Sequence, residues 1–366
     1  MSLKIAIQAD ANVLSNGEHQ SYSKRWFELA AQQQGIEAVA VDVFAQNIIE
    51  QIAACDAFMW RYDPSAIPRL YADRLLHAVE DGLHMPVFPS RKSRWHFEDK
   101  IGQAYFLSAA GFPIPATHVF WTRDQAVNFC DTTSYPFVLK LANGDKSSNV
   151  QLVRNRSDAL YYVEQLFNWG CVSLGYKPAS RGRLALRHLR AAFQMLRGQN
   201  PYGLNPYVNL QHGYFLAQEF VPNNDFDVRV TITGDRAFVF RRFNRPGDFR
   251  ASGSGRVDWD PKQVGEDCVR LGYGAAHKLG SQTLTVDIIR RGSELVIVEL
   301  GLAYASYAIR KCPGHWVLDG AAESGTLKWI EGYMHPEDAI FEDFMAEIRR
   351  AKNVTNEPAQ GERTTA

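Results

Sequence analysis

Hydrophobic and polar positions near the start of the chain predict a wound α/β domain. Three short apolar runs have the length of buried strands: residues 4–8, 36–44 and 56–60. Segments with helical spacing lie between and after these runs, and this alternation favours a parallel sheet with helices on its faces. Loops at the carboxyl ends of such strands bind ligands, so Arg61 and Asp63, which follow the third run, are candidate substrate contacts. Asp63 followed by Pro64 is equally typical of a simple turn.

The pattern changes near residue 98, where we predict a domain boundary. A helical stretch at 99–110 ends at Gly111, and two prolines then force an extended exit into a strand at 117–121. Lys100 lies at the start of this helix. A lysine at this position could point at a bound phosphate, or it could simply be exposed to water.

Residues 135–155 carry the first candidate chemistry. A predicted strand at 137–141 places Lys140 within an apolar run, and a buried lysine needs an anionic partner or a shifted pKa. The loop of small polar residues that follows, 143–149, could fold its backbone N–H groups over phosphates. It lacks the spacing of a Walker A loop, and an ordinary hairpin loop without a ligand is the alternative.

A basic amphipathic segment follows. Residues 165–218 contain no acidic side chain, and their cations are Lys177, Arg181, Arg183, Arg187, Arg190 and Arg197. If 183–198 is a helix, its arginines share one face, and the opposite face holds Ala185, Leu189, Ala192, Phe193 and Leu196. This element could contact an anionic polymer, a phospholipid surface or an acidic partner, or it could be a solvated basic face on an inserted helix.

Further along, three strands are predicted at 215–221, 226–232 and 237–243. On the second strand Asp227 and Arg229 share one face, and Arg241 lies on the third. Arginines within an antiparallel sheet are costly unless they bind carboxylates or phosphates, although an edge strand could keep them in water. A Gly/Ser loop at 248–256 then follows and contains Arg250 and Arg256.

Two acids lie in a predicted hairpin at 285–301. With a three-residue loop at 291–293, Glu299 falls opposite Thr285 and on the same face as Asp287. Two carboxylates about 5 Å apart would repel by about 3 kcal/mol at an effective dielectric of about 20. Such a pair persists if one acid is protonated, if an arginine lies between them, or if they bind a metal such as Mg²⁺. Alternatively, each acid alone could lie at the end of its strand and face solvent.

Composition narrows the class of protein. The hydrophobic share of 46% and the charged share of 22% are those of a globular protein, and the formal net charge of zero argues against nucleic acid as a partner of the whole molecule. The five cysteines are scattered, which suggests reduced thiols. No signal peptide and no apolar run long enough to span a membrane is predicted, and no GxGxxG motif follows the first strand. We therefore expect a cytoplasmic location.

The order of these motifs resembles the ATP-grasp fold over residues 99 to about 301. The strings FPSRKSRWHFEDKIGQAYFLSAAGFPIPA, from Phe88, and FRASGSGR, from Phe249, are most similar to ATP-grasp proteins found with sugar-transfer and polysaccharide genes, and more distantly to RimK-like ligases. The resemblance implies an α/β fold with an α+β lid. Its expected parts are a wound domain at 1–98, a linker helix and lid at 99–221 with a basic insertion at about 170–212, a C-terminal subdomain at 222–350 and a disordered tail at 351–366.

The same resemblance implies roles for the candidate residues. ATP would be bound by Lys100, Lys140, Gly144, Ser147, Ser148, Asn149, Gln218, Glu219, Phe220, Val221 and Asp227. Arg229 and Arg241 or Arg242 would steady the phosphates, while Asp287 and Glu299 hold Mg²⁺. Arg250 and Arg256, with Arg61 and Asp63 from the first domain, would grip the substrate.

The implied activity is an ATP- and Mg²⁺-dependent ligase that joins a carboxylate to an amine through an acyl phosphate. Its substrates would be small molecules or glycan-linked groups, such as a sugar acid or an amino-acid group in polysaccharide biosynthesis. One position departs from the usual Glu-x-Asn metal motif, because Glu299 is followed by Leu300 and then Gly301. The alternative is therefore a weakly active or inactive ATP-binding sensor. The oligomeric state is not predicted.

Overall fold

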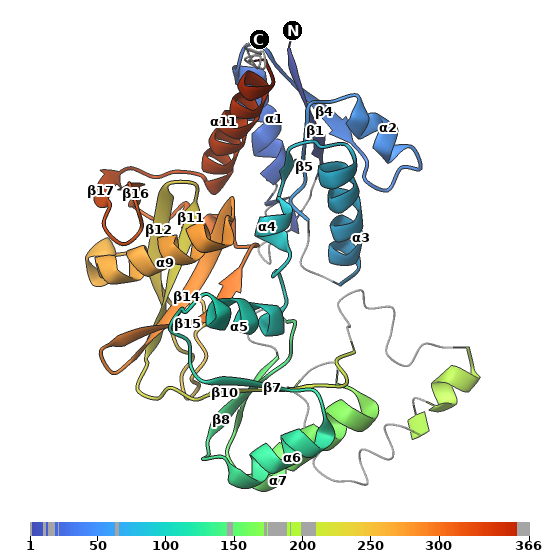
Figure 1. The fold of residues 1–366 in the computed structure, drawn as a ribbon, viewed down its shortest axis with the longest axis vertical. Coiled ribbons are helices and arrows are strands. Elements are labelled where there is room, and N and C mark those ends of the chain that lie inside the picture. Colours follow the sequence, from blue (N-terminus) through green and yellow to red (C-terminus); the bar gives the residue numbers. More distant parts are fainter. Residues whose placement is uncertain are drawn as a thin grey trace, which may run out of the picture.

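The computed structural model arranges the chain around three larger sheets, which follow one another along the long axis of the molecule (Figure 1). The structure describes residues 2–9, 12–13, 19–20, 22–62, 66–144, 149–171, 174, 189–190, 192–198 and 210–356. Within this part of the chain no helix is both long enough and apolar enough to cross a membrane. No disulfide bond joins the cysteines.

The N-terminal sheet is parallel, with strand order β4-β1-β5-β6. Its elements are β1 (Leu3–Gln8), α1 (Tyr22–Gln32), β4 (Ile36–Val41), α2 (Ile48–Ala53), β5 (Ala57–Met59), α3 (Ala66–His77), the π-helical turn η1 (Ala78–Gly82) and β6 (Val87–Phe88), with a small hairpin of β2 (Asn12–Val13) and β3 (His19–Gln20). Alternating side chains of β1 fill two cores. Ile5 and Ile7 pack with Trp26 of α1, whereas Ala6 packs with α2 and α3. This confirms the wound α/β fold that the apolar runs predict.

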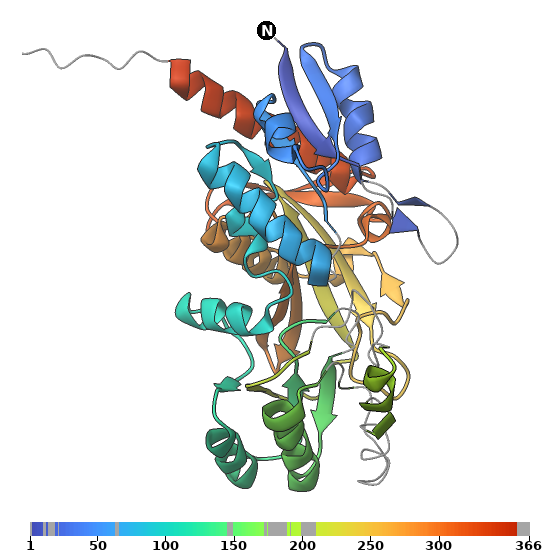
Figure 2. The same ribbon diagram turned by 90° about the vertical axis from the view of Figure 1, so that its right-hand side faces the viewer.

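The lid sheet is antiparallel in the order β7-β10-β8-β9, and two helices cover one of its faces (Figure 2). The chain enters it through α4 (Arg91–Arg94) and α5 (Lys100–Ala109). The lid elements are β7 (Thr117–Phe120), α6 (Arg123–Thr132), β8 (Phe137–Lys140), β9 (Val150–Val153), α7 (Arg156–Glu164), the π-helical turn η2 (Gln165–Trp169) and β10 (Phe215–Glu219). Side-chain caps fix the starts of the helices: Asp99 accepts a hydrogen bond from the backbone N–H of Gly102, and Asn155 from that of Asp158.

The large sheet has the order β15-β14-β11-β12-β16-β17, and β13 pairs with β12. Its elements are β11 (Phe226–Thr233), β12 (Arg236–Phe243), β13 (Val257–Asp258), the 3₁₀ turn η3 (Pro261–Gln263), α9 (Glu266–Leu279), β14 (Thr283–Arg291), β15 (Glu294–Gly301), α10 (Ser306–Ile309), β16 (Gly314–Asp319), β17 (Thr326–Glu331) and α11 (Pro336–Asn356). Helix α9 packs on one face through Tyr273 and its neighbours, and Leu107 of α5 joins the same core. The opposite face is polar at its centre and forms the floor of the site described below.

The edge strand β15 is covered by helix α5. The side-chain amide of Gln103 donates to the carbonyl of Leu300 at 2.8 Å and accepts from its N–H at 3.0 Å, as a neighbouring strand would. The linker helix is thereby fixed to the strand that carries Glu299. This contact fixes the position of α5, the helix that leads into the lid, relative to the large sheet.

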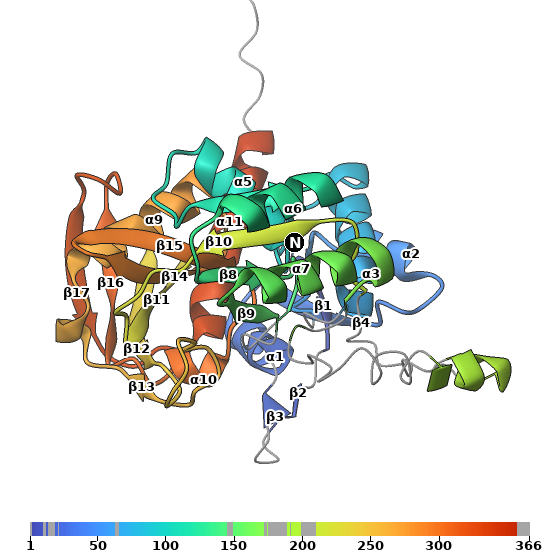
Figure 3. The ribbon, with the colours of Figure 1, turned by 90° about the horizontal axis from the view of Figure 1, so that it is seen from below.

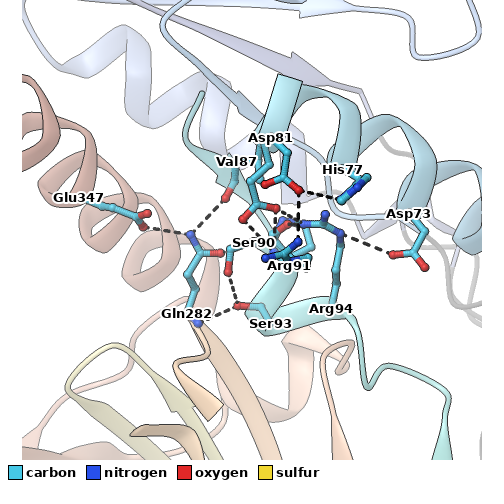
Figure 4. A network of polar contacts seen from close by, with 12 residues as sticks. Asp73, His77, Asp81, Val87, Ser90, Arg91, Ser93, Arg94, Gln282 and Glu347 are labelled. Atoms are coloured by element: carbon cyan, nitrogen blue, oxygen red, sulfur yellow. Dashed lines mark hydrogen bonds and ion pairs between the residues drawn. The ribbon is translucent and has the colours of Figure 1, made fainter. Parts of the chain in front are cut away.

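A second junction joins the large sheet to the N-terminal domain (Figure 4). The side chain of Gln282 accepts from the N–H of Ser90 at 2.8 Å and donates to the carbonyl of Val87 at 3.1 Å and to Glu347 of α11 at 3.0 Å. Nearby, Arg94 is buried, and its guanidinium donates to Glu80 at 2.7 Å. One glutamine thus connects strand β14 with the first sheet and the last helix.

The C-terminal part of the chain extends the large sheet and then returns to the N-terminal domain. Strand β16 begins at Gly314 and pairs with β17 at the edge of the large sheet. Helix α11 runs to Asn356, past the expected domain end at residue 350, and its residues Ile340 and Phe344 pack with β1 and α1. Residues 357–366 of the expected disordered tail lie outside the described residues.

Candidate functional site

A pocket lies between the lid sheet and the polar face of the large sheet. It encloses about 830 Å³ that no protein atom fills, part of it open to solvent. The lid contributes Val138, Lys140 and Val150, and the connector after β10 contributes residues 218–221. The large sheet contributes Asp227, Arg242, Asp287, Val298 and Glu299.

Strand register brings the charged side chains of the large sheet to one face. Asp227 of β11 lies opposite Arg242 of β12, and Arg229 lies opposite Asp287 of β14, which in turn lies opposite Glu299 of β15. Directly opposed residues in an antiparallel sheet point to the same side. The five side chains therefore form a continuous charged surface from β12 to the edge strand.

The acid-bearing hairpin differs from its predicted register. Its turn has two residues, Gly292 and Ser293, and Gly292 adopts a φ of +63°, which suits a primed hairpin turn. A bulge next to Asp287 then shifts the pairing, so that Glu299 lies opposite Asp287 and not opposite Thr285. The prediction that both acids share a face is confirmed. The predicted three-residue loop is wrong, because the pattern of apolar residues does not reveal the bulge.

Two arginines hold Asp287. Its carboxylate accepts from Arg229 Nε and Nη2 at 2.7 and 2.8 Å, and from Arg242 Nη2 at 2.7 Å. Arg242 also makes two bonds to Asp227, at 2.7 and 2.6 Å. Burial alone would raise the pKa of Asp287, but the two guanidinium groups outweigh it and hold that pKa well below its usual range. Asp287 is therefore ionised at neutral pH.

Two lysines approach Glu299 from the other side of the pocket. Lys100 Nζ lies 2.9 Å from Glu299 Oε1 and also donates to the carbonyl of Gly144 at 3.1 Å. Lys140 Nζ donates at 3.0 Å to the carbonyl of Val298, the extra residue of the bulge. Burial, which outweighs the opposing effect of Glu299, and the smaller effect of the Lys100 charge together lower the pKa of Lys140 to about 8.

The start of the candidate phosphate loop is fixed to the linker. The N–H of Gly144 donates to Glu98 at 2.7 Å, and Gly144 has a φ of +127°. A side chain at this position would meet Asn149, whose Nδ2 donates to the carbonyl of Asn143. Gly144 and Asn149 thus shape the loop but are absent from the pocket lining. Ser147 and Ser148 lie outside the described residues.

The end of β10 and the connector that follows it form another wall of the pocket. Gln218, Glu219, Phe220 and Val221 all line it, as the sequence predicts. The Glu219 carboxylate is used structurally, since it accepts from the N–H of Ala116 at 3.0 Å and from Arg291 at 2.9 Å. Other lining residues escaped sequence reasoning: Asn223, Asn224, Phe226, Asn244, Phe249 and Ile289. Phe249 lies within the predicted Gly/Ser loop at 248–256, which is the one sequence signal for it.

Arg241 does not share this surface. It lies on the opposite face of β12, pairs with Asp258 of β13 and stacks over the rings of Phe226 and Phe243. Side chains alternate along a strand, so only one of two consecutive arginines can face the pocket, and that one is Arg242. The expected phosphate role of Arg241 is therefore corrected in favour of Arg242, which the sequence left as the alternative.

The arginines of the Gly/Ser loop occupy different places. Arg250 lines the pocket, pairs with Asp248 and donates to the carbonyl of Val150 in the lid at 3.2 Å. Arg256 is exposed, donates to the carbonyl of Asn244 and lies over the ring of Phe243. Arg250 thus connects the two walls of the pocket, whereas Arg256 lies outside its lining.

Arg61 lies in a smaller cavity, between the N-terminal domain and the large sheet. Its guanidinium stacks over the ring of Tyr22 at 4.8 Å, and the cavity walls include Trp60, Phe97, Thr283 and Tyr304. Thr283 and Asp287 lie on the same face of β14, four positions apart, or about 13 Å at the usual rise. The structure therefore places Arg61 near, but not within, the charged pocket. Asp63 lies outside the described residues.

Asp287 and Glu299 supply some, but not all, of the ligands that a hard cation such as Mg²⁺ requires. Among the described residues, no three His, Cys, Asp or Glu side chains cluster closely enough to hold a metal. Asp287 and Glu299 do offer adjacent carboxylates that line one pocket, and Mg²⁺ is often held by one or two carboxylates plus substrate phosphates. A side chain at Gly301 would meet Thr285 Oγ1 at 2.6 Å, so Thr285 occupies the space beside this position. The donor set thus fits Mg²⁺ only together with phosphate oxygens.

Comparison with known proteins identifies the fold. No model of a protein family matches the sequence. D-alanine–D-alanine ligase from Bacillus anthracis, solved with ATP, aligns over 96% of this chain and 99% of its own, with 11% identity and a TM-score of 0.55. An ATP-grasp RimK domain protein from Sphaerobacter thermophilus aligns over 84% and 95%, with 18% identity and a TM-score of 0.50. D-cycloserine synthetase aligns over 94% and 99%, with 17% identity and a TM-score of 0.50.

These similarities cover 84–96% of the chain. They do not distinguish a subgroup, so the resemblance to sugar-transfer proteins stays a prediction. The expected architecture, a wound α/β domain followed by a lid and a large antiparallel sheet, is confirmed. The chain has the ATP-grasp fold.

Proposed function

We propose that the protein is an ATP-dependent ligase that joins a carboxylate to an amine. In this reaction the substrate carboxylate attacks the γ-phosphate of ATP, giving an acyl phosphate and ADP, and the amine then displaces phosphate to form an amide. The observation that carries the proposal is the single pocket where Lys140, Arg242, Asp287 and Glu299 converge from two sheets. The named activities of the similar structures, D-alanine–D-alanine ligase and D-cycloserine synthetase, support it.

The chain's own residues would act by position and charge. The apolar connector at 218–221 suits a flat base, and Lys100 and Lys140 lie where the phosphates of such a nucleotide would extend. Arg242 is fixed by Asp227 and Asp287, so its charge is preorganised toward the pocket. Arg250 reaches the lid backbone and would help to exclude water when the lid closes over substrates.

Asp287 and Glu299 would hold Mg²⁺ together with the nucleotide phosphates. When bound, the ion would neutralise negative charge on those phosphates. Glu299 would give up its ion pair with Lys100 and bind the ion instead. Its side chain is 35% exposed, and Lys100 is its one ion-pair partner among the described residues. Asp287 would keep its arginines, which orient its carboxylate.

For the substrates we propose a chemical class and not a particular compound. Arg61, in its aromatic cavity, and Arg250 are the candidate contacts for a small-molecule or glycan-linked acid. The sequence resemblance to polysaccharide-associated proteins favours a sugar acid or an amino-acid group on a glycan precursor.

Release of ADP tests the proposal. We expect ADP release that requires Mg²⁺ and a matched acid and amine, found by screening sugar acids against amino acids. Asp287→Asn should lower turnover by at least about a hundredfold, because it removes the charge of one of the two carboxylates proposed to hold Mg²⁺. The matched control is Asp258→Asn, which breaks an arginine pair on the opposite sheet face and should keep turnover near wild type. Equal losses in both variants would contradict the assigned role of Asp287.

A second candidate is an ATP-binding sensor without turnover. It is favoured by the ion pairs that already engage both acids and by Gly301, which offers no side-chain oxygen. A sensor would bind ATP without releasing ADP for any pair of substrates, and Asp287→Asn would still bind the nucleotide. Measuring ATP affinity and ADP release on the same variant separates the two candidates.

A further inference from the structure

The basic segment exposes apolar side chains that no other part of the described chain covers. Its residues 189–190 and 192–196 are helical, and the helix ends at Gly198, which has a φ of +72°. The segment lies apart from the three sheets in Figures 1 and 3, where it is the short yellow-green helix. Its exposed large apolar residues are Leu189 (67%), Phe193 (55%), Met195 (54%) and Leu196 (86%).

Three of these side chains form one stripe. Leu189, Phe193 and Leu196 are spaced by four and three residues, so they lie on the same side of the helix. Arg190 and Arg197 lie together beside this stripe, and the guanidinium of Arg197 stacks over Phe193 at 4.2 Å. An inserted helix that merely displayed a solvated basic face would bury its apolar stripe on the body. Here both the stripe and the arginines face solvent.

The charge of the region is of one sign. Residues 165–218 contain six Lys and Arg and no Asp or Glu. A second copy of the chain would bring like charges together at this segment, which disfavours self-association. Nucleic acid would neutralise the arginines but leave Leu189 and Leu196 in water. A surface that is anionic outside and apolar a few ångströms below matches both features.

We propose that this segment binds the chain to an anionic phospholipid surface, with Leu189, Phe193 and Leu196 inserted among the acyl chains. Arg190 and Arg197 lie at the level of the headgroups and pair with lipid phosphates. The pocket between the lid and the large sheet is not part of this contact. The inference is therefore independent of the proposed ligase activity.

Co-sedimentation of the full-length protein with vesicles tests the proposal. Wild-type protein binds vesicles of phosphatidylcholine and phosphatidylglycerol, binds pure phosphatidylcholine far more weakly, and is released as salt is raised. Arg190→Gln with Arg197→Gln weakens binding by about 30-fold, since each cation contributes about fivefold near such a surface. Leu189→Gln with Leu196→Gln also weakens it at least tenfold, by roughly the loss of buried apolar area.

Matched controls use exposed residues elsewhere. Tyr333→Gln and Arg154→Gln remove an exposed ring and an exposed cation far along the chain from the segment, and vesicle binding stays at the wild-type level. Phe193→Trp adds a reporter whose emission shifts to the blue on insertion. Vesicle binding that is absent, or equal in the segment variants and the controls, overturns the proposal. The proposal is also overturned if light scattering shows an oligomer that the leucine substitutions dissociate. The stripe would then be a contact between copies of the chain.

Discussion

The surroundings of Lys140 lead to a prediction that can be tested directly in solution. Lys140 is buried between the lid and the bulged strand, and burial lowers its pKa to about 8. The folded protein therefore loses this positive charge as pH rises through about 8, whereas an exposed lysine keeps it up to about 10.4. A nucleotide phosphate next to Lys140 would favour the charged form and raise that pKa again.

We predict that ATP affinity falls as pH rises from 7 to 9, and that binding near pH 8.5 takes up a proton. Calorimetry in two buffers of different ionisation enthalpy measures this uptake directly. Lys140→Met should bind ATP at least about tenfold more weakly, as expected for loss of one charged contact, and should lose the proton uptake. A wild-type proton uptake that persists in Lys140→Met would assign the titration to another group.

The residue scale also shows where sequence reasoning succeeds. A lysine in an apolar run and an acid between β-branched residues are local signals, and Lys140, Asp287 and Glu299 all reach the pocket. The choice between Arg241 and Arg242 is not local. It depends on which face of β12 meets Asp227 across the sheet, and that pairing is fixed by tertiary structure.

At the scale of elements, most strands could be predicted because their apolar runs have the right period. The bulge at Val298 could not, since it depends on a carbonyl that leaves the ladder to accept from Lys140. The geometry of the site thus depends on an irregular feature, which the local pattern of apolar and polar residues does not predict.

Gln282 makes a prediction for the contact between elements. Replacing it by alanine leaves the N–H of Ser90 and the carbonyl of Val87 without their partner at a part-buried junction. Gln282→Ala should lower the free energy of unfolding by about 1–3 kcal/mol, measured by chemical denaturation. Gln263→Ala, which removes an exposed side chain with a long bond to Asp260, should change it by less than about 0.5 kcal/mol. Equal values for the two would show that the junction adds no stability.

At the scale of the whole molecule, one pocket depends on elements that are far apart in sequence. Lys140 comes from the lid, whereas Arg242, Asp287 and Glu299 come from the large sheet. Lys100 of the linker helix lines a smaller adjoining cavity and reaches Glu299 at 2.9 Å. Helix α5 ties these parts together through Gln103 and Leu300. Nucleotide binding should therefore stabilise the lid and the large sheet as one unit.

The central claim is that this pocket binds ATP, and calorimetric titration with ATP in the presence and absence of Mg²⁺ tests it most directly. The account predicts one ATP per chain, tighter binding with Mg²⁺, and loss of the Mg²⁺ effect in Asp287→Asn, with Asp258→Asn unchanged. An absence of binding under both conditions, accompanied by no change in Tm at millimolar ATP, would contradict it.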